Sequence, residues 1–347
     1  MTAVLFFGSG RGSGKTNGGR GSRVGERWAL GVDLGGTKLE VARVNGDGKI
    51  RDSLRMATDV DGGPAAVEAD MARMSRALWE KAGSPPTGIG VGVPGQIDGK
   101  LGIVRFLPNL GWRDVPLRED LERLLSIPAL ITNDVRAIAW GEHLHGAGRG
   151  IDDLVCLYVG TGIGGGIISG GRLIEGCTTT AGELGHITID INGPPCTCGN
   201  RGCLEALAGG WAIARQAREM VESDPLAGER MLSLAGGLLE GINAETVAKA
   251  AASGDHLSLS LLEKVGRALI AGCVSLVNAF NPCRLILGGG VIEGVPDLID
   301  KVRIGVKRSA LPASMANLEV VPGLLGAHAG PVGAASLALA LSPRDGK

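Results

Sequence analysis

Four side chains that could bind a metal ion lie within eighteen residues of one another. His186, Cys196, Cys198 and Cys203 are separated by nine, one and four residues. Thiolate and imidazole groups are ligands that Zn²⁺ prefers, and four of them complete a tetrahedral site that has no open position for chemistry. The spacing therefore predicts a structural zinc that pins a long loop. A set of free or redox-active cysteines is the alternative.

The other four cysteines, Cys156, Cys177, Cys273 and Cys283, lie in or beside apolar stretches. A free cysteine behaves as a small apolar residue, so these positions predict core side chains. Seven cysteines in a chain of 347 residues without a recognisable secretion leader argue against a disulfide scaffold.

A glycine-rich segment at residues 160–166 could bind phosphate. Five of its seven residues are glycine, and apolar runs flank it on both sides. This pattern predicts a hairpin whose turn exposes backbone N–H groups to a polyphosphate, through Gly160, Thr161, Gly162 and Gly164. Gly160, Gly162 and Gly165 also match the dinucleotide-binding spacing G-x-G-x-x-G. That fingerprint opens a helix, however, and here an apolar strand follows, which disfavours an oxidoreductase.

Residues 33–38 form a second glycine-rich segment of the same kind. The segment Asp33-Leu-Gly35-Gly36-Thr37-Lys38 follows an apolar strand. Its glycines allow close approach of the backbone to a ligand, Thr37 offers a hydroxyl, and Asp33 could hold a hydrated Mg²⁺. Together the two turns predict two lobes that close on one nucleotide.

A third glycine-rich segment near the N-terminus resembles a phosphate loop but departs from it. In the spacing G-x-x-x-x-G-K-[ST], the first glycine falls on Ser9, and no helical pattern follows Lys15. We therefore expect no phosphate binding there.

Carboxylates stand at three further positions that could do chemistry. Asp134 follows Asn133 at the end of an apolar strand, where catalytic groups of α/β proteins gather, although Asp134 could equally cap the helix that follows. Glu183 and Glu205 flank the zinc ligands. Each of these carboxylates is weak evidence when taken singly.

The elements that must position these residues alternate between strands and helices, which predicts an α/β fold. Strands or hairpins are expected at residues 28–44, 49–58, 87–97, 128–134, 153–174 and 284–292, and helices at 64–82, 117–125, within 204–280 and at 330–341. Two halves that both begin with a strand, a glycine turn and a strand indicate duplication of one fold.

The chain is expected to divide into three parts. Residues 1–27 form a flexible tail rich in Gly, Ser and Arg. Residues 28–133 form a smaller α/β lobe, which the C-terminal helix 331–343 joins, and residues 134–330 form a larger α/β lobe that carries the zinc.

Composition excludes several classes of function. The formal net charge is −1, so no basic field favours nucleic acid or a membrane surface. Apolar runs fall short of the roughly 20 residues that span a bilayer. The first seven residues, MTAVLFF, lack the basic leader of a signal peptide. We expect a cytoplasmic protein.

The chain resembles the ROK family of sugar kinases and repressors, and within it the bacterial glucokinases. The stretches that carry the resemblance are DLGGTK (33–38), GVGVPGQID (90–98), NDVRAIAWGE (133–142), GTGIGGGI (160–167), AGELGH (181–186), CTCGNRGCLE (196–205) and LGGGV (287–291). They occur in the family's order and extend from about residue 29 to the C-terminus.

The resemblance implies a two-lobed hexokinase/actin-like (ribonuclease H-like) fold and an ATP- and Mg²⁺-dependent kinase that phosphorylates the 6-hydroxyl of glucose. Carried over, Asp134 is the general base. The implied sugar-binding residues are Asn133, Asp134, Glu183, His186, Glu205 and Gly95. The implied nucleotide-binding residues are Asp33, Gly35, Gly36, Thr37, Lys38, Gly160, Thr161, Gly162, Gly164, Gly288, Gly289 and Gly290, the last three near the adenosine.

Some alternatives stay open at this stage. N-acetylmannosamine or another hexose could replace glucose, polyphosphate could replace ATP, and a homodimer or a homotetramer fits the family. A ROK repressor would need an N-terminal DNA-binding domain, which 27 tail residues cannot form. The family is commonly rich in Ala and Asn after the Asn-Asp pair, whereas Arg136 stands there in this chain. Arg136 lies two residues past the implied base and could alter its environment.

Overall fold

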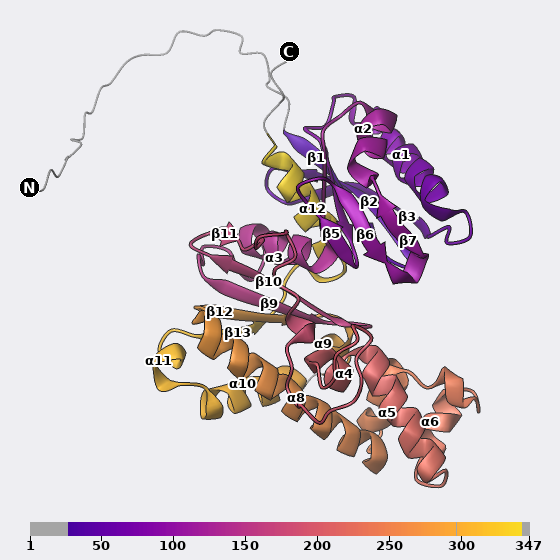
Figure 1. Ribbon diagram of the computed structural model, residues 1–347, viewed down its shortest axis with the longest axis vertical. Coiled ribbons are helices and arrows are strands. Elements are labelled where there is room, and N and C mark those ends of the chain that lie inside the picture. Colours follow the sequence, from indigo (N-terminus) through magenta and orange to yellow (C-terminus); the bar gives the residue numbers. More distant parts are fainter. Residues whose placement is uncertain (1–26, 296, 342–347) are drawn as a thin grey trace, which may run out of the picture.

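The computed structural model describes residues 27–295 and 297–341. Apart from Arg27, the predicted tail lies outside these residues, and so does the segment that resembles a phosphate loop. Within the described residues two five-stranded sheets form two lobes, one above the other in Figure 1. This confirms the predicted two-lobed α/β fold.

The first sheet has the strand order β3-β2-β1-β4-β8. Its strands are β1 (Trp28–Leu34), β2 (Lys38–Asn45), β3 (Ile50–Ala57), β4 (Ile89–Val93) and β8 (Ala129–Asn133). The first three strands pair antiparallel, and β4 and β8 add in parallel.

The second sheet repeats this topology, with the strand order β11-β10-β9-β12-β13. Its strands are β9 (Leu154–Val159), β10 (Ile163–Ser169), β11 (Arg172–Leu173), β12 (Arg284–Gly288) and β13 (Glu319–Pro322). Again an antiparallel hairpin comes first and two parallel strands follow. The repeat agrees with the duplication that the two glycine turns indicate.

A small antiparallel sheet in the first lobe was not expected from the sequence. It consists of β5 (Gln96–Asp98), β6 (Ile103–Leu107) and β7 (Trp112–Val115), with a 3-10 turn η1 (Pro108–Leu110). Helices α1 (Gly63–Ala82) and α2 (Leu117–Leu125) share one apolar core with the first sheet and this small one.

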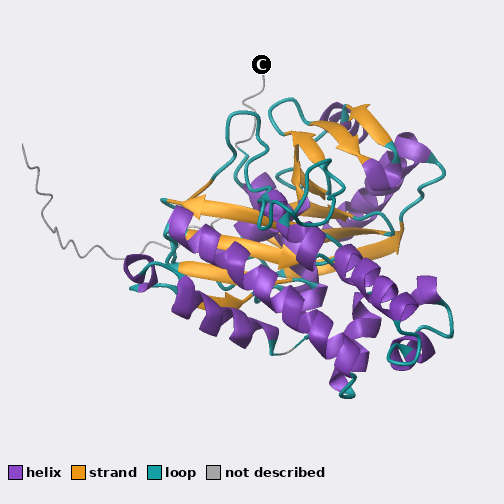
Figure 2. Ribbon diagram, turned by 60° about the horizontal axis from the view of Figure 1, so that its bottom comes forward, coloured by secondary structure: helices purple, strands orange, loops and turns teal. Residues whose placement is uncertain are grey.

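The helices of the second lobe pack on the second sheet around the larger apolar core (Figure 2). They are α4 (Leu204–Ala208), α5 (Gly210–Ser223), α6 (Glu229–Leu234), α7 (Ala244–Ala252), α8 (His256–Phe280), α9 (Gly290–Gly294), α10 (Leu298–Ser309) and α11 (Pro312–Met315). Short 3-10 turns are η2 (Leu184–His186), η3 (Leu239–Gly241) and η4 (Gly326–His328). None of the helices formed by residues 27–295 and 297–341 is long and apolar enough to cross a membrane.

Two helices lie between the sheets, α3 (Asp134–His145) and α12 (Ala329–Leu339). Glycines let α12 touch the first sheet directly, because a Cβ atom on Gly31 would lie 1.9 Å from the carbonyl oxygen of Pro331. The helix begins two residues before the predicted segment 331–343 and ends at Leu339. Residues 342 and 343 lie outside the described part.

Candidate active site and metal centre

The first sheet presents two aspartates at one edge. β1, β4 and β8 are parallel, and Asp33 lies opposite Gly92 while Val93 lies opposite Asn133. The carboxyl ends of these strands therefore meet, and Asp134 follows directly at the start of α3. Gly92 leaves room for this approach, since a Cβ atom there would lie 3.2 Å from the Cα of Asp134. This edge is where ligands of open α/β sheets bind.

Asn133, and not Asp134, is the residue that caps α3. Its side-chain oxygen accepts the backbone N–H groups of Val135 at 3.0 Å and Arg136 at 3.2 Å. Asp134 is the first residue of the helix, where one of its carboxylate oxygens accepts the N–H of Val135 at 2.9 Å. The alternative that Asp134 caps the helix is therefore wrong, because Asn133 is the cap. One carboxylate oxygen of Asp134 stays available for a ligand.

Burial raises the pKa of Asp134 to about 6, and the negative charges of Asp33 and Glu183 add to this effect. Burial also raises the pKa of Asp33, while Lys38 lowers it. A carboxylate whose pKa lies close to physiological pH can exchange a proton efficiently with a substrate hydroxyl. The two carboxylates lie at the same sheet edge, with β4 between their strands, and a carboxylate oxygen is a ligand that a divalent cation such as Mg²⁺ prefers.

The turn between β1 and β2 is tight. The N–H of Gly35 donates to the carbonyl of Lys38 at 2.8 Å, and the hydroxyl of Thr58 donates to the carbonyl of Gly35 at 2.8 Å. Thr37 is exposed at its tip. Lys38 is already paired, since its ammonium lies 3.1 Å from the buried Glu40.

The turn between β9 and β10 faces the same region from the second lobe. Thr161 is exposed and a Cβ atom on Gly160 would meet nothing within 4 Å. The glycines beyond the turn have a packing reason instead: a Cβ atom on Gly162, Gly164 or Gly166 would lie within 2.5 Å of a side-chain atom of Glu205, Val135 or Ala139, respectively. The tip of the turn, residues 160 and 161, has the most open space around it, whereas side chains of the second lobe and of α3 pack closely on Gly162, Gly164 and Gly166.

The remaining glycines of the predicted nucleotide and sugar sites lie at strand ends. Gly288 pairs with Tyr158 next to the β9–β10 turn, and Gly289 has a positive φ of 91° and would clash with the carbonyl of Val159 if it carried a Cβ. Gly95 follows β4 with a φ of 109°, in the turn that leads to β5. Both φ values lie where only glycine is comfortable.

The four predicted metal ligands do come together. Their ligand atoms all lie within 4.8 Å of one another. The Sγ of Cys196 lies 3.6 Å from Nδ1 of His186, and the Sγ atoms of Cys198 and Cys203 lie 3.7 Å apart. Zinc–sulfur bonds of about 2.3 Å in a tetrahedron require ligand separations of about 3.8 Å, so the cluster has the dimensions of a zinc site.

The cluster of predicted metal ligands lies next to two of the candidate carboxylates in the chain. η2 leads from Glu183 to His186, and α4 begins one residue after Cys203 and carries Glu205. Glu205 accepts the N–H of Ile163 at 2.8 Å and the indole N–H of Trp211 at 3.1 Å. Glu183 is exposed, but loss of hydration on its protein-facing side raises its pKa, while Arg136 and His186 oppose that rise.

The prediction for the other cysteines is half wrong. Cys156 and Cys273 are buried, whereas Cys177 and Cys283 are exposed. Cys177 lies in the loop before η2, and Cys283 lies in the turn before β12. The apolar stretches near these two cysteines in the sequence therefore did not predict that their side chains are buried.

The sequence pointed to Arg136 only as a departure from the family, and it missed Trp211 and Thr179. Arg136 is buried, and its guanidinium donates to the carbonyl of Thr179. Burial lowers the pKa of Arg136, while the charges of Glu183, Glu175 and Asp134 raise it. Arg136 therefore lies among the acidic groups of the site. The contacts of Trp211 and Thr179 depend on tertiary packing, and no local pattern signals them.

Comparison with known proteins places these features in a family. The sequence profile of the ROK family matches residues 29–340. A glucokinase of Thermotoga maritima is 38% identical over 310 residues, which span 89% of this chain and 96% of that protein. A crystal structure of a ROK family glucokinase from Streptomyces griseus in complex with glucose and AMPPNP is similar, with a TM-score of 0.78 and 34% identity over 89% of this chain and 98% of that one.

Relatives with other activities are also similar to this chain. An N-acetylmannosamine kinase of Escherichia fergusonii is 32% identical over 78% of this chain and 86% of that protein. A xylose repressor of Bacillus subtilis is 33% identical over 73% of this chain, and the match spans 61% of the repressor.

Proposed function

The chain belongs to the ROK family, and on that premise we propose that it is an ATP-dependent hexose kinase that transfers the γ-phosphoryl group to the 6-hydroxyl of glucose. The observation that carries the proposal is the position of Asp134. Its carboxylate stands at the carboxyl edge of the first sheet, close enough to Asp33 and Glu183 to feel their charges, in a chain whose relatives include glucokinases.

Asp134 acts as the general base. With a pKa of about 6 it is mostly ionised at neutral pH, and it accepts the proton of the sugar hydroxyl as that oxygen attacks phosphorus. Its position at the first turn of α3 is rigid, because Asn133 caps the helix. Phosphoryl transfer needs chiefly positioning and charge stabilisation, so a rigid base of modestly raised pKa is adequate.

The two glycine turns hold the phosphates of ATP. Gly160 and Thr161 offer the open tip of the β9–β10 turn, and Thr37 is exposed at the tip of the β1–β2 turn. Asp33, next to Asp134, is the residue that would hold hydrated Mg²⁺, and Mg²⁺ supplies neutralisation of phosphate charge when bound. Gly288, Gly289 and Gly290 lie beside the adenosine.

Zinc supports the sugar pocket. The ligands are His186, Cys196, Cys198 and Cys203, and Nδ1 of His186 is the ring nitrogen turned toward the sulfurs. A metal on Nδ1 leaves Nε2 as an N–H donor for a sugar hydroxyl. Asn133, Glu183, Glu205 and the backbone at Gly95 complete the set of polar groups. Carboxylates and amides suit a polyhydroxylated, uncharged ligand.

An ADP-release assay over a panel of hexoses tests the proposal. We expect ATP-dependent turnover that is highest with glucose, and no turnover in the presence of ATP with fructose. Higher turnover with N-acetylmannosamine would favour the second candidate, which the match to an N-acetylmannosamine kinase supports. The same panel of hexoses with polyphosphate in place of ATP identifies the phosphoryl donor. Absence of turnover with every hexose would reject the kinase.

The variant Asp134→Asn tests the base. We expect kcat to fall by at least about 100-fold, the usual contribution of a general base, with glucose binding nearly unchanged. Asp61→Asn, at an exposed aspartate before α1, is the matched control. Near-normal kcat in Asp134→Asn would remove Asp134 from this role.

We also infer that the protein acts in the cytoplasm as a homodimer or homotetramer and does not bind nucleic acid. Size-exclusion chromatography with light scattering, and retention of DNA at physiological salt, check these points. Retention of DNA would favour the repressor alternative, although the match to this chain spans 61% of the xylose repressor.

A further inference from the structure

The loop between β11 and η2 contains a threonine in a strained backbone conformation. Thr179 has a φ of 59° and is buried, whereas its neighbours Thr178 and Thr180 are exposed. A positive φ is a genuine outlier for a β-branched residue and persists only where surrounding contacts impose it. The loop itself is closed by a bond from the N–H of Ala181 to the carbonyl of Glu175 at 3.0 Å.

Contacts on both sides hold Thr179 in place. Its carbonyl accepts a hydrogen bond from the buried guanidinium of Arg136 in α3. Its hydroxyl oxygen accepts the backbone N–H of Gly99 in the first lobe at 2.8 Å, and its hydroxyl proton is directed to the carbonyl of Thr178 at 2.6 Å. One residue of the loop therefore joins α3 to the turn between β5 and β6.

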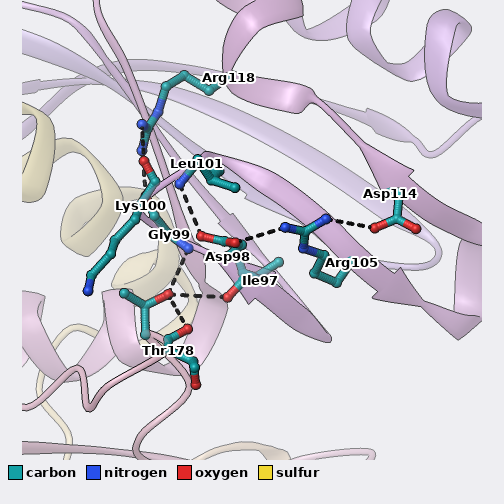
Figure 3. Close-up of polar contacts among 10 residues, drawn as sticks. Ile97, Asp98, Gly99, Lys100, Leu101, Arg105, Asp114, Arg118 and Thr178 are labelled. Atoms are coloured by element: carbon teal, nitrogen blue, oxygen red, sulfur yellow. Dashed lines mark hydrogen bonds and ion pairs between the residues drawn. The ribbon is translucent and has the colours of Figure 1, made fainter.

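Hydrogen bonds and ion pairs also connect the residues of that turn, as Figure 3 shows. Asp98 accepts the N–H of Leu101 at 3.0 Å and pairs with Arg105 at 2.9 Å. Arg118 donates to the carbonyls of Gly99 and Lys100. These bonds fix the direction of the Gly99 N–H toward Thr179. The ammonium of Lys100 adds a second bond to the loop, to the carbonyl of Cys177 at 3.3 Å.

Arg136 and Thr179 both lie close in the chain to residues of the proposed active site. Arg136 stands two residues after Asp134, and Thr179 stands four residues before Glu183. The charge on Arg136 acts on Glu183 more than on any other carboxylate of the site. The Nε of Arg136 is buried and has no hydrogen-bond partner among the described residues, so the guanidinium is held there at a cost in hydrogen bonding.

We propose that Thr179 is a positioning residue that forms a latch to Gly99 of the first lobe, and that Arg136 is the positioning residue that holds Thr179 in place from α3. The latch holds the loop that carries Glu183 against the β5–β6 turn, so that the sugar site is assembled from both lobes. This inference rests on the proposed hexose kinase activity for its effect on sugar binding, but the latch contact itself does not depend on the substrate.

The test compares Thr179→Val with Thr179→Ser and Thr180→Val. Valine keeps the shape of Thr179 but removes the hydroxyl that accepts the Gly99 N–H and donates to the carbonyl of Thr178, and serine restores both bonds. Among residues 27–295 and 297–341, the partner of the Thr180 hydroxyl is the hydroxyl of Thr178 in the same loop, at 2.9 Å, so Thr180→Val is the matched control. We expect Thr179→Val to raise the KM for glucose by about fivefold to tenfold, because loss of the bond between the lobes leaves the Gly99 N–H unpaired, with kcat changed less than about twofold.

A second readout needs no substrate. Amide hydrogen exchange should become at least about fivefold faster in Thr179→Val for peptides that contain residues 97–101 and 174–183, while Thr179→Ser and Thr180→Val behave as the wild type. Arg136→Met should accelerate exchange in 174–183 as well. Unchanged exchange in Thr179→Val, or a lower melting temperature with unchanged KM, would overturn the latch. If the wild type phosphorylates no hexose, the proposed function fails, and the exchange experiment still decides the latch.

Discussion

The Oε2 atom of Glu205 lies 2.8 Å from the backbone nitrogen of Ile163, so the helix that follows the metal cluster is bonded to the glycine hairpin of the second sheet. The other oxygen of the same carboxylate accepts the indole N–H of Trp211 at 3.1 Å. Each carboxylate oxygen has a second lone pair, which leaves room for a sugar hydroxyl. Glu205 thus connects the proposed sugar pocket with the proposed phosphate turn.

Glu205→Gln should weaken both substrates. Ile163 and Trp211 both present N–H donors, and the amide of glutamine has only one acceptor oxygen, so one of the two contacts becomes a repulsion between donors. We expect kcat/KM to fall by at least about tenfold for glucose and for ATP, on the scale of one to two charged hydrogen bonds. The measurement is a steady-state matrix of both substrates, with the exposed Glu219→Gln on α5 as control. An effect on glucose alone would separate Glu205 from the phosphate turn.

The pH profile should report Asp134. The base must be ionised, so kcat/KM should decline as pH falls through about 6, the pKa to which burial and the charges of Asp33 and Glu183 raise this carboxyl. Removing the charge in Asp33→Asn should lower the pKa of Asp134 and move the acid limb to lower pH. The midpoint can be read even if the maximal rate drops, and carboxyl NMR of labelled aspartate checks it without turnover. A limb that stays in place in Asp33→Asn would contradict the electrostatic link.

Loss of zinc should damage the sugar pocket and the fold together. We expect about one zinc per chain by atomic absorption, because four ligands complete one tetrahedral site. Cys198→Ser should lose that zinc, melt at a lower temperature and raise the glucose KM by at least about tenfold, since His186, Glu183 and Glu205 depend on the pinned loop. Cys283→Ser, at an exposed cysteine outside the cluster, is the control. A metal-free, fully active protein would rule out this structural function.

Local patterns in the sequence predicted much of this architecture. The hairpins at Asp33 and Gly160 follow from apolar β-branched runs interrupted by glycine, and ligand spacing alone predicted that His186 and three cysteines come together. The sequence did not predict the small sheet β5–β7, because its strands have three to five residues of mixed polarity, too few for a periodic signal. The bond between Gly99 and Thr179 joins residues 80 positions apart, and only the tertiary fold brings them together.

Glu142 should be essential for stability where the chain passes between the lobes. Its buried carboxylate accepts the N–H groups of Ala147 at 2.7 Å and of Leu325 at 2.9 Å, which lie in the two connections between the sheets, and the hydroxyl of Tyr158 at 3.0 Å. Glu142→Gln would turn an amide N–H₂ toward some of these donors. We expect a loss of about 2–4 kcal/mol in the free energy of unfolding, measured by urea denaturation. The exposed Glu222→Gln should change it by less than about 0.5 kcal/mol, and an equally small effect at Glu142 would show that water replaces these bonds.

Glu68 should make the protein less stable as the pH rises toward neutrality. The residue is only 6% exposed on α1, and one of its carboxyl oxygens has no hydrogen-bond partner among the described residues. Burial and the charge of Asp120 raise its pKa from 4.5 to about 7, with Arg123 acting against them. Because the folded state then binds the proton more tightly than the unfolded state, the stabilisation is complete below about pH 4.5 and is lost as the pH rises to about 7.

The variant Glu68→Gln isolates this contribution, since a neutral amide of the same shape does not titrate. Relative to the wild type, Glu68→Gln should gain about 2–3 kcal/mol of stability between pH 4.5 and pH 8, at 1.36 kcal/mol per unit of pKa difference. The difference between the two proteins cancels other titrating groups, including any metal ligands that protonate in acid. Glu80→Gln, at an exposed position of the same helix, should show no such trend. A stability difference that stays constant from pH 4.5 to pH 8 would mean that Glu68 ionises freely in the folded protein.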